Sequence, residues 1–326
     1  MAKRLGKILP IFAKRKWGGG APKGRWRSIA LSATLAACTQ TPVQTVSHRT
    51  PKIVSLNPCS DAILAEVTQP GQLLAISHYS TDPRASSMDP AKARQYPATR
   101  GTLEEIIALR PDVVVDGTFV PPSTVAAYNR LGFALEALPI AATVEDSHAQ
   151  IRRLAALAGH PERGEALIRR IDAALTIAAP PKGAPAIPAL VWEPGGIVPG
   201  DKTLIADLLR RTGFANFSAA RGFGQADQLP LEHVLADPPR VILAAGSDRA
   251  LTHPALANLN TTQRAPLDPA LLYCAGPTII RAAARLAEVR RALGPTHKQE
   301  GSAFALSSPL PLAGAVRGGQ TVRSNP

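Results

Sequence analysis

One stretch of the sequence decides how the chain is organised: residues 162–178 read ERGEALIRRIDAALTIA, and residues 180–185 read PPKGAP. The first segment carries apolar side chains along one face of a 3.6-residue period, at Leu167, Ile168, Ile171 and Leu175. This pattern predicts a helix roughly 25 Å long, at a rise of 1.5 Å per residue. The prolines end the helix and mark the sharpest change of composition in the chain, so we expect a domain boundary there.

Short apolar runs alternate with helical patterns on both sides of this helix, which is typical of parallel α/β proteins. Residues 113–115 are VVV, as expected of a central strand that is covered on both faces. Strands are expected at 53–56, 73–77, 113–115, 133–138, 187–191 and 241–245, and helices at 62–67, 102–110, 123–131, 144–158, 201–211, 231–236 and 277–293. The predicted fold class is α/β, with two doubly wound α/β lobes joined by a single long helix.

The chain has 326 residues, which is enough for two ordinary domains. We expect an N-terminal α/β lobe over residues 52–158, the bridging helix over 159–180 and a C-terminal α/β lobe over 185–295. Residues 296–326 are rich in Gly, Ser, Pro and Ala without a period, so a disordered tail is expected there.

Residues 1–37 have the composition of a lipoprotein signal peptide. A basic segment precedes the uncharged run SIALSATLAA at 28–37, which has the length of a signal-peptide apolar region and is too short to span a bilayer. The run ends in LAAC at 35–38, which resembles the bacterial lipobox. The resemblance implies cleavage before Cys38 and acylation of that residue, with residues 38–51 as a tether and a periplasmic, membrane-anchored product. The alternative is a buried cysteine after an Ala-rich helix.

The basic excess of the chain comes from this leader. The formal net charge is +13, but residues 1–37 hold nine Lys and Arg and no acid, which leaves 28 basic against 24 acidic residues from Cys38 onward. No basic stripe with interleaved aromatic residues remains, so a nucleic-acid partner is not expected. The sequence also lacks CxxC, HExxH and zinc-spaced His and Cys, and we predict neither a metal site nor a cofactor of the protein's own.

Five stretches carry a resemblance to a known family, in their content and in their order. They are KIVSLNPCSDAIL at 52–64, GTLEEIIALRPDVVV at 101–115, VPGDKTLIADLLRRTGFANF at 198–217, LPLEHVLADPPRVILAAG at 229–246 and GPTIIRAAARLAEV at 276–289. Over about residues 52–293 the chain resembles the substrate-binding proteins of ABC importers for vitamin B12 and ferric siderophores, the class III periplasmic binding proteins. The resemblance implies two lobes on one rigid helix, with ligand in the cleft at the carboxyl ends of the strands.

Each lobe has a short helix that leads into a buried strand and carries a Glu near its start, Glu104 in the first lobe and Glu232 in the second. An acidic residue in the first turn complements the helix dipole, and this is the plain interpretation of both. The resemblance implies a further role, in which one Glu per lobe docks onto arginines of the transporter's membrane subunits. Charge-assisted pairs suit that role because they fix register across a wet surface.

Aromatic residues in loops that follow strands, or that lie at the expected cleft, are the first ligand-binding candidates. They are Tyr79, Phe119, Trp192, Phe223 and Tyr273. Aromatic faces suit a broad planar or macrocyclic ligand, and the alternative for each residue is that it closes the packing of its loop. Trp192 is the strongest candidate, because it is the only Trp after the leader and is followed at once by EPGG.

Four polar or sulfur-containing residues complete the candidate set. Asn57 and Cys59 follow the first strand and His78 follows the second; a neutral His78 could ligate a metal centre, or simply be solvated. A single rim His is too few to capture bare Zn²⁺ or Mn²⁺, so the ligand is expected to bring its own chelator. Cys59 and Cys274 are expected at loops of different lobes, as a disulfide, as two unpaired thiols, or as soft contacts to a metal complex.

We therefore expect an extracytoplasmic substrate-binding lipoprotein of an ABC importer, which captures a corrinoid, a ferric siderophore or a haem-like compound. Its expected partners are that metal chelate, the membrane subunits of the permease, and the membrane through its N-terminal lipid. We expect a monomer with no catalytic residues. The alternative is a tetrapyrrole-metal enzyme of chelatase-like fold, and the lack of G-x-S-x-G, P-loop and Rossmann patterns in the sequence argues against it.

Overall fold

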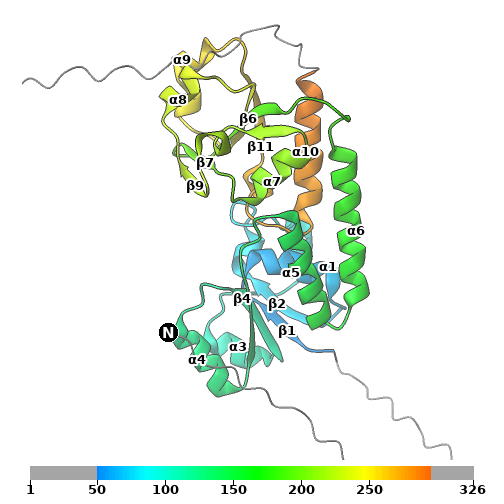
Figure 1. Cartoon of the computed structure of the whole chain (residues 1–326). Helices are drawn as coiled ribbons and strands as arrows, with labels where there is room; N and C mark the ends of the chain where they lie inside the picture. Colours follow the sequence, from blue (N-terminus) through cyan, green and yellow to red (C-terminus); the bar gives the residue numbers. More distant parts are fainter. Residues whose placement is uncertain (1–49, 295–326) are drawn as a thin grey trace, which may run out of the picture. The chain divides into compact units, whose positions relative to one another are not determined.

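The computed structural model describes residues 50–294. The predicted signal segment 1–37, the lipidation site Cys38, most of the tether and the tail at 296–326 lie outside the described residues. Within residues 50–294, two parallel sheets follow one another along the chain, and their lobes belong to one compact unit (Figure 1). The fold is the predicted α/β architecture.

The N-terminal lobe is built on a five-stranded parallel sheet with the order β3-β2-β1-β4-β5. Its strands are β1 Ile53–Ser55, β2 Leu73–Ser77, β3 Ala98–Thr99, β4 Val113–Gly117 and β5 Ala134–Leu138. Its helices are α1 Pro58–Val67, the 3₁₀ turn η1 His78–Thr81, α2 Pro90–Ala93, α3 Leu103–Leu109, α4 Pro122–Leu131 and α5 Val144–Leu157. After β1 the chain adds β2 and then β3 on one side of β1, and it then crosses to the other side of β1 to add β4 and β5. The topological switch point therefore lies between β1 and β4, where a ligand is expected in an open α/β sheet.

The C-terminal lobe repeats this arrangement on a four-stranded parallel sheet with the order β11-β10-β6-β8. Its strands are β6 Ile187–Trp192, β8 Phe214–Asn216, β10 Val241–Ala245 and β11 Gln263–Leu267, with an antiparallel pair of β7 Ile197–Pro199 and β9 Ala226–Gln228 beside them. Its helices are α7 Leu204–Arg211, η2 Ala219–Arg221, α8 Leu231–Ala236, η3 Ala250–Thr252, α9 Pro254–Ala257, η4 Pro269–Leu271 and α10 Thr278–Ala292. The switch point of this sheet lies between β6 and β10.

One long helix, α6 Pro161–Ala178, connects the two lobes. It packs on α1 and α5 of the first lobe and on α10 of the second, and Figure 1 shows it running beside both. Its buried face contains the predicted apolar side chains, Leu167, Ile168, Ile171 and Leu175. Gly164 permits the close approach of α6 to α5, since a Cβ built there would lie 2.6 Å from the Cβ of Ala155.

The apolar core does not stop at the boundary between the lobes. One cluster of buried side chains runs from Ile53 of β1 through Ile151 and Ile171 of α5 and α6 to Ala189 of β6 and Leu286 of α10. A second cluster lies on the other face of the C-terminal sheet, and a third on the other face of the N-terminal sheet. No helix within residues 50–294 is both long enough and apolar enough to cross a membrane.

Candidate functional site

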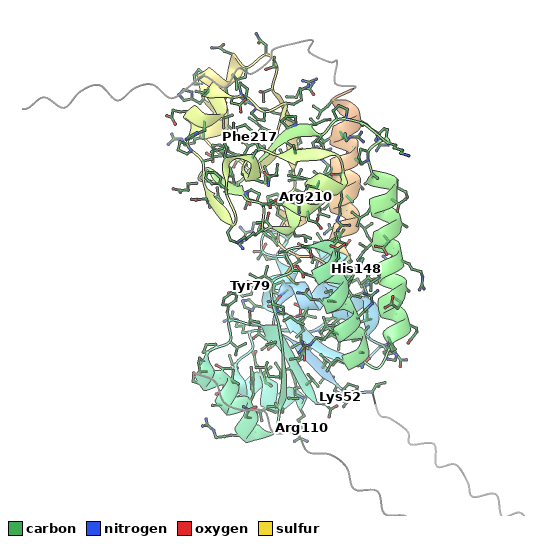
Figure 2. The ribbon with its side chains drawn as sticks, in the orientation of Figure 1. Lys52, Tyr79, Arg110, His148, Arg210 and Phe217 are labelled. Atoms are coloured by element: carbon green, nitrogen blue, oxygen red, sulfur yellow. A yellow bond between two sulfur atoms is a disulfide. The ribbon has the colours of Figure 1, made fainter. Side chains whose placement is uncertain are left out.

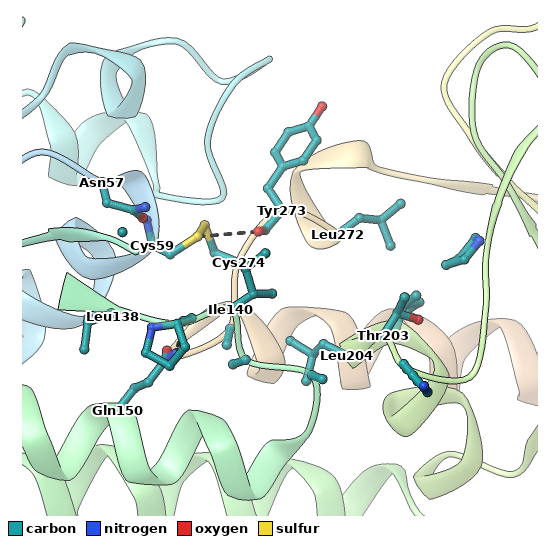
Figure 3. Close-up of a pocket in the computed structure, with 18 of the residues that line it drawn as sticks. Asn57, Cys59, Leu138, Ile140, Gln150, Thr203, Leu204, Leu272, Tyr273 and Cys274 are labelled. Carbon is teal, nitrogen blue, oxygen red and sulfur yellow. Dashed lines mark hydrogen bonds between the residues drawn. A yellow bond between two sulfur atoms is a disulfide. The ribbon is translucent and has the colours of Figure 1, made fainter. Parts of the chain in front are cut away.

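A pocket of about 310 Å³ lies between the two lobes, at the carboxyl ends of the strands. From the N-terminal lobe it is lined by the segments that follow β1, β4 and β5, and from the C-terminal lobe by the segments that follow β6 and β7 and precede α10. Figure 3 shows Leu138, Ile140 and Gln150 on the N-terminal side and Thr203 and Leu204 on the C-terminal side. Both switch points therefore contribute to the same cavity.

Asn57 lies at the N-terminal switch point because it begins α1. Its side-chain oxygen accepts the backbone N–H of Cys59 at 2.8 Å, which caps the helix. The amide nitrogen lies on the other side, against Gly117 of β4, where a built Cβ would come within 3.0 Å of it. The predicted candidate Asn57 thus lines the pocket with its orientation set by the helix it caps.

Cys59 and Cys274 form a disulfide that joins the two lobes, with their Cα atoms 5.0 Å apart. This geometry selects the first of the three alternatives, and unpaired thiols or soft contacts to a metal complex are not what the structure contains. Both residues line the pocket, Cys274 buried and Cys59 half-buried, and the Cys59 Sγ lies 3.4 Å from the carbonyl oxygen of Tyr273 (Figure 3). A covalent bond between the lobes therefore forms part of the pocket wall.

Exposed apolar side chains gather around this pocket. Phe119 is 83% exposed, Ile140 77% and Tyr273 43%, and all three line the cavity. A group of large apolar side chains that are exposed to solvent is typical of a surface that binds a ligand or a partner. The predicted candidates Phe119 and Tyr273 therefore lie where the sequence placed them.

Two charged side chains face the pocket from the C-terminal lobe, Glu193 after β6 and Lys202 before α7. Burial raises the pKa of the Glu193 carboxyl above its ordinary value. The loop that carries Glu193 is held by Asp248, whose Oδ2 accepts the backbone N–H groups of Gly195 at 2.9 Å and Gly196 at 3.2 Å. The sequence analysis missed both Glu193 and Lys202, although Glu193 lies two residues after the strand predicted at 187–191.

The structure corrects the expectation for Trp192. Its side chain is 2% exposed and packs in the second apolar cluster with Val198 and Phe217, so the ring does not line the pocket. The indole N–H donates to Asp248 Oδ2 at 2.9 Å, which satisfies it in the interior. Phe223 is also corrected: it packs against the same cluster and is outside the pocket lining.

His78 and Tyr79 lie in the turn η1, outside the pocket lining. Their rings are in contact, with centroids 4.0 Å apart, and Tyr79 is 54% exposed. Figure 2 shows Tyr79 on the side of the lobes opposite α6, near the level at which the lobes meet. These two predicted candidates are therefore placed near the junction of the lobes without contributing to the cavity.

The buried carboxyl of Asp61 in α1 fixes this turn. Its Oδ2 accepts the backbone N–H of Ser77 at 2.9 Å and the hydroxyl of Ser80 at 2.6 Å. Burial raises the pKa of Asp61 to about 8, although both hydrogen bonds act to lower it. The Oδ1 atom has no hydrogen-bond partner among the described residues.

Glu104 and Glu232 occupy the first turns of α3 and α8, and both side chains are exposed. Neither has a hydrogen-bond or ion-pair partner in the part of the chain that the structure describes. The neighbouring Glu105 differs from Glu104, because its carboxylate accepts hydrogen bonds from the hydroxyl of Thr99 and, at 2.8 Å, from the backbone N–H of Arg100. In Figure 1, α3 and α8 both lie on the side away from α6.

Three comparisons place this architecture among known proteins. Solved structures of similar fold include the periplasmic heme-binding protein RhuT from Roseiflexus sp. RS-1 in its apo form, at 22% identity and a TM-score of 0.56, covering 75% of this chain and 98% of that one. The vitamin B12-binding protein BtuF of Vibrio cholerae is 19% identical with a TM-score of 0.57, and the match covers 75% of this chain and 98% of that one. The heme-binding protein HutB of Vibrio cholerae is 16% identical with a TM-score of 0.60, and the match covers 73% of this chain and 98% of that one. A search of curated protein sequences finds no match.

At these identities the structural likeness shows the fold alone. The family comes from the sequence itself, since residues 53–265 match the family model described as periplasmic binding protein. The matched region begins at β1 and ends in β11, so it contains both sheets, α6 and most of the pocket-lining segments. This chain therefore belongs to the periplasmic binding protein family.

Proposed function

We propose that this protein is the substrate-binding component of an ABC importer and that it captures a metal chelate between its lobes. The observation that carries the proposal is the position of the pocket, which takes its walls from the carboxyl ends of both sheets. Open α/β sheets bind ligands at these points. Two of the similar structures are described as heme-binding and one as vitamin B12-binding, and chelates of this kind suit an apolar cleft with a few polar groups.

Ligand binding tests this proposal directly. The purified protein is titrated by calorimetry with cyanocobalamin, haemin and a ferric trihydroxamate, and one of these is expected to bind with one molecule per chain. Ile140→Glu should weaken that binding about tenfold or more, because it places a charge on an exposed apolar wall of the pocket. Ile177→Glu is the matched control, since Ile177 is 84% exposed on α6 and outside this pocket. No binding by any chelate, or equal effects of the two substitutions, would contradict the proposal.

Delivery to the permease is proposed to run through Glu104 and Glu232. Their exposure and free carboxylates support this role, because an ion pair with a partner then breaks no contact within the protein. A Glu104→Ala/Glu232→Ala variant should bind the chelate as the unmodified protein does but lose most uptake in cells that hold the cognate permease. Glu162→Ala is the control, because Glu162 is also a first-turn acid but lies on α6. Uptake that survives the double substitution would refute the docking role.

The proposed location is the periplasm, with the chain anchored through an acylated Cys38. The sequence LAAC at 35–38 supports this placement. The unmodified protein should incorporate a labelled fatty acid and a Cys38→Ser variant should not, and an unmodified protein that takes up no label would contradict the anchor.

A further inference from the structure

The charge of the pocket limits the class of chelate that it can hold. Among the described residues that line the cavity, Lys202 and Glu193 are the only side chains with a formal charge, and no arginine reaches it. The two charges are opposite, so the lining as a whole is neutral. A ligand with several carboxylates or catecholates would find one lysine to pair with and one carboxylate to oppose it.

Three arginines of the C-terminal lobe, Arg210, Arg211 and Arg281, are held in place by other partners. Arg211 donates to both oxygens of Glu145 at 2.6 and 2.7 Å and to Asp207 at 2.9 Å. Arg210 donates to Asp201 at 2.6 Å, and Arg281 donates to the carbonyl oxygen of Ser87. Turning any of these guanidinium groups toward the pocket would break a charge-assisted or buried hydrogen bond. These three guanidinium groups are therefore not available to the pocket lining.

The remaining polar groups of the lining are amides and hydroxyls. They come from Asn57, Gln150, Gln225, Thr118 and Thr203. Gln150 already donates to the carbonyl oxygen of Pro139 at 2.6 Å, and its own side-chain oxygen accepts no hydrogen bond from another residue of 50–294. Groups of this kind match the amide and hydroxyl edges of a ligand, while the apolar side chains Phe119 and Ile140 cover its faces.

We infer that the pocket selects a chelate without net negative charge, whose periphery carries amide or hydroxyl groups, and excludes polyanionic chelates. This inference rests on the proposed function and narrows its substrate class. A ferric trihydroxamate and a corrinoid have the required charge. A ferric tris-catecholate and a haem with ionised propionates do not.

The test is a titration of the full mature protein with four probes: a neutral ferric trihydroxamate, cyanocobalamin, haemin and a ferric tris-catecholate. A neutral probe should bind at least about tenfold more tightly than either anionic probe. Its dissociation constant should also change little between 50 and 500 mM salt, a range over which added salt increasingly screens exposed charge interactions. Tighter binding of an anionic probe overturns the inference and leaves the proposed function standing. Binding of none of the four overturns both.

A matched pair of substitutions tests the cause. Gln225→Arg adds a guanidinium to the pocket lining, and Gln228→Arg adds the same group three residues further along, outside it. Both positions are exposed, so neither substitution disturbs the core. The first variant should gain about tenfold or more in affinity for the tris-catecholate and the second should gain none. Equal behaviour of the two variants would show that pocket charge does not set the selectivity.

Discussion

Replacing both bridged cysteines, in a Cys59→Ser/Cys274→Ser variant, measures how strongly the disulfide stabilises the two-lobed fold. The bridge closes a loop across a sequence separation of 215 residues. In the chain-entropy account, a cross-link over a loop of this length restricts the unfolded chain and raises the free energy of unfolding by about 5 kcal/mol. The double variant should therefore lose stability of that order, with the native fold retained because α6 and the continuous core still join the lobes.

Urea unfolding followed by circular dichroism is the assay. Because one apolar cluster extends through both lobes, we expect a single cooperative transition. At a denaturant dependence of roughly 2.5 kcal/mol per molar, the midpoint of the double variant should fall by about 2 M urea. The slope should also rise, because an unfolded chain without the cross-link is less compact and exposes more surface.

Reductant separates the cross-link from the effect of serine. Treating the unmodified protein with dithiothreitol should reproduce the lower midpoint, and the same treatment should leave the double variant unchanged. A double variant within about 1 kcal/mol of the oxidised protein would refute the reasoning, because the loop-closure contribution for this separation is several times larger.

Two further predictions concern the packing at Gly164 and the buried carboxyl of Asp61. Gly164→Ala should destabilise the protein by about 1–3 kcal/mol, since its Cβ would lie 2.6 Å from that of Ala155; adding Ala155→Gly should restore part of the loss in urea unfolding, and no restoration would place the strain elsewhere. Asp61 has a pKa raised by burial to about 8 from an ordinary 3.8, so the folded state keeps a proton that the unfolded state releases, and the free energy of unfolding should fall as pH rises from about 4 to about 8. Asp61→Asn should remove this slope between pH 5 and pH 8, and a slope that survives the substitution would contradict the shifted pKa.

Elements with a dense local pattern were predictable from the sequence. The helix expected at 162–178 is α6 Pro161–Ala178, because its apolar stripe and the prolines after it act within a few residues. The helix expected from residue 201 begins instead at Leu204. Residues 200–202 are held by backbone hydrogen bonds to the segment at 223–225, among them Lys202 N–H to Gly224 O at 2.6 Å. Partners more than 20 residues away set this boundary, and no local pattern reports them.

For the candidate site, too, local sequence predicted some features, and contacts between distant residues decided the others. Asn57, Cys59, Phe119 and Tyr273 were placed at the pocket by the rule that ligands meet the carboxyl ends of parallel strands. Trp192 satisfied that rule and still turned inward, because Asp248, 56 residues further on, supplies the acceptor for its indole N–H. The choice among the three cysteine alternatives likewise depended on a contact 215 residues apart. Position at a strand end can be read from the sequence, but the direction of a side chain there depends on distant partners.

The contacts that join the two lobes bear on how ligand is released. The first turn of α5 alone makes three such contacts: Val144 N–H to Asp207 at 3.0 Å, Glu145 to Arg211, and Ser147 Oγ accepting the N–H of Gly276 at 3.0 Å. With the disulfide beside them, the lobes have little freedom to separate at this point. The proposed docking residues lie in α3 and α8, on the side away from α6. A permease that pulls there acts at a distance from these contacts, so it can open the pocket while the contacts and the disulfide hold. Release by this route requires only a small opening, and recognition then depends on a pocket that is largely formed before the ligand arrives.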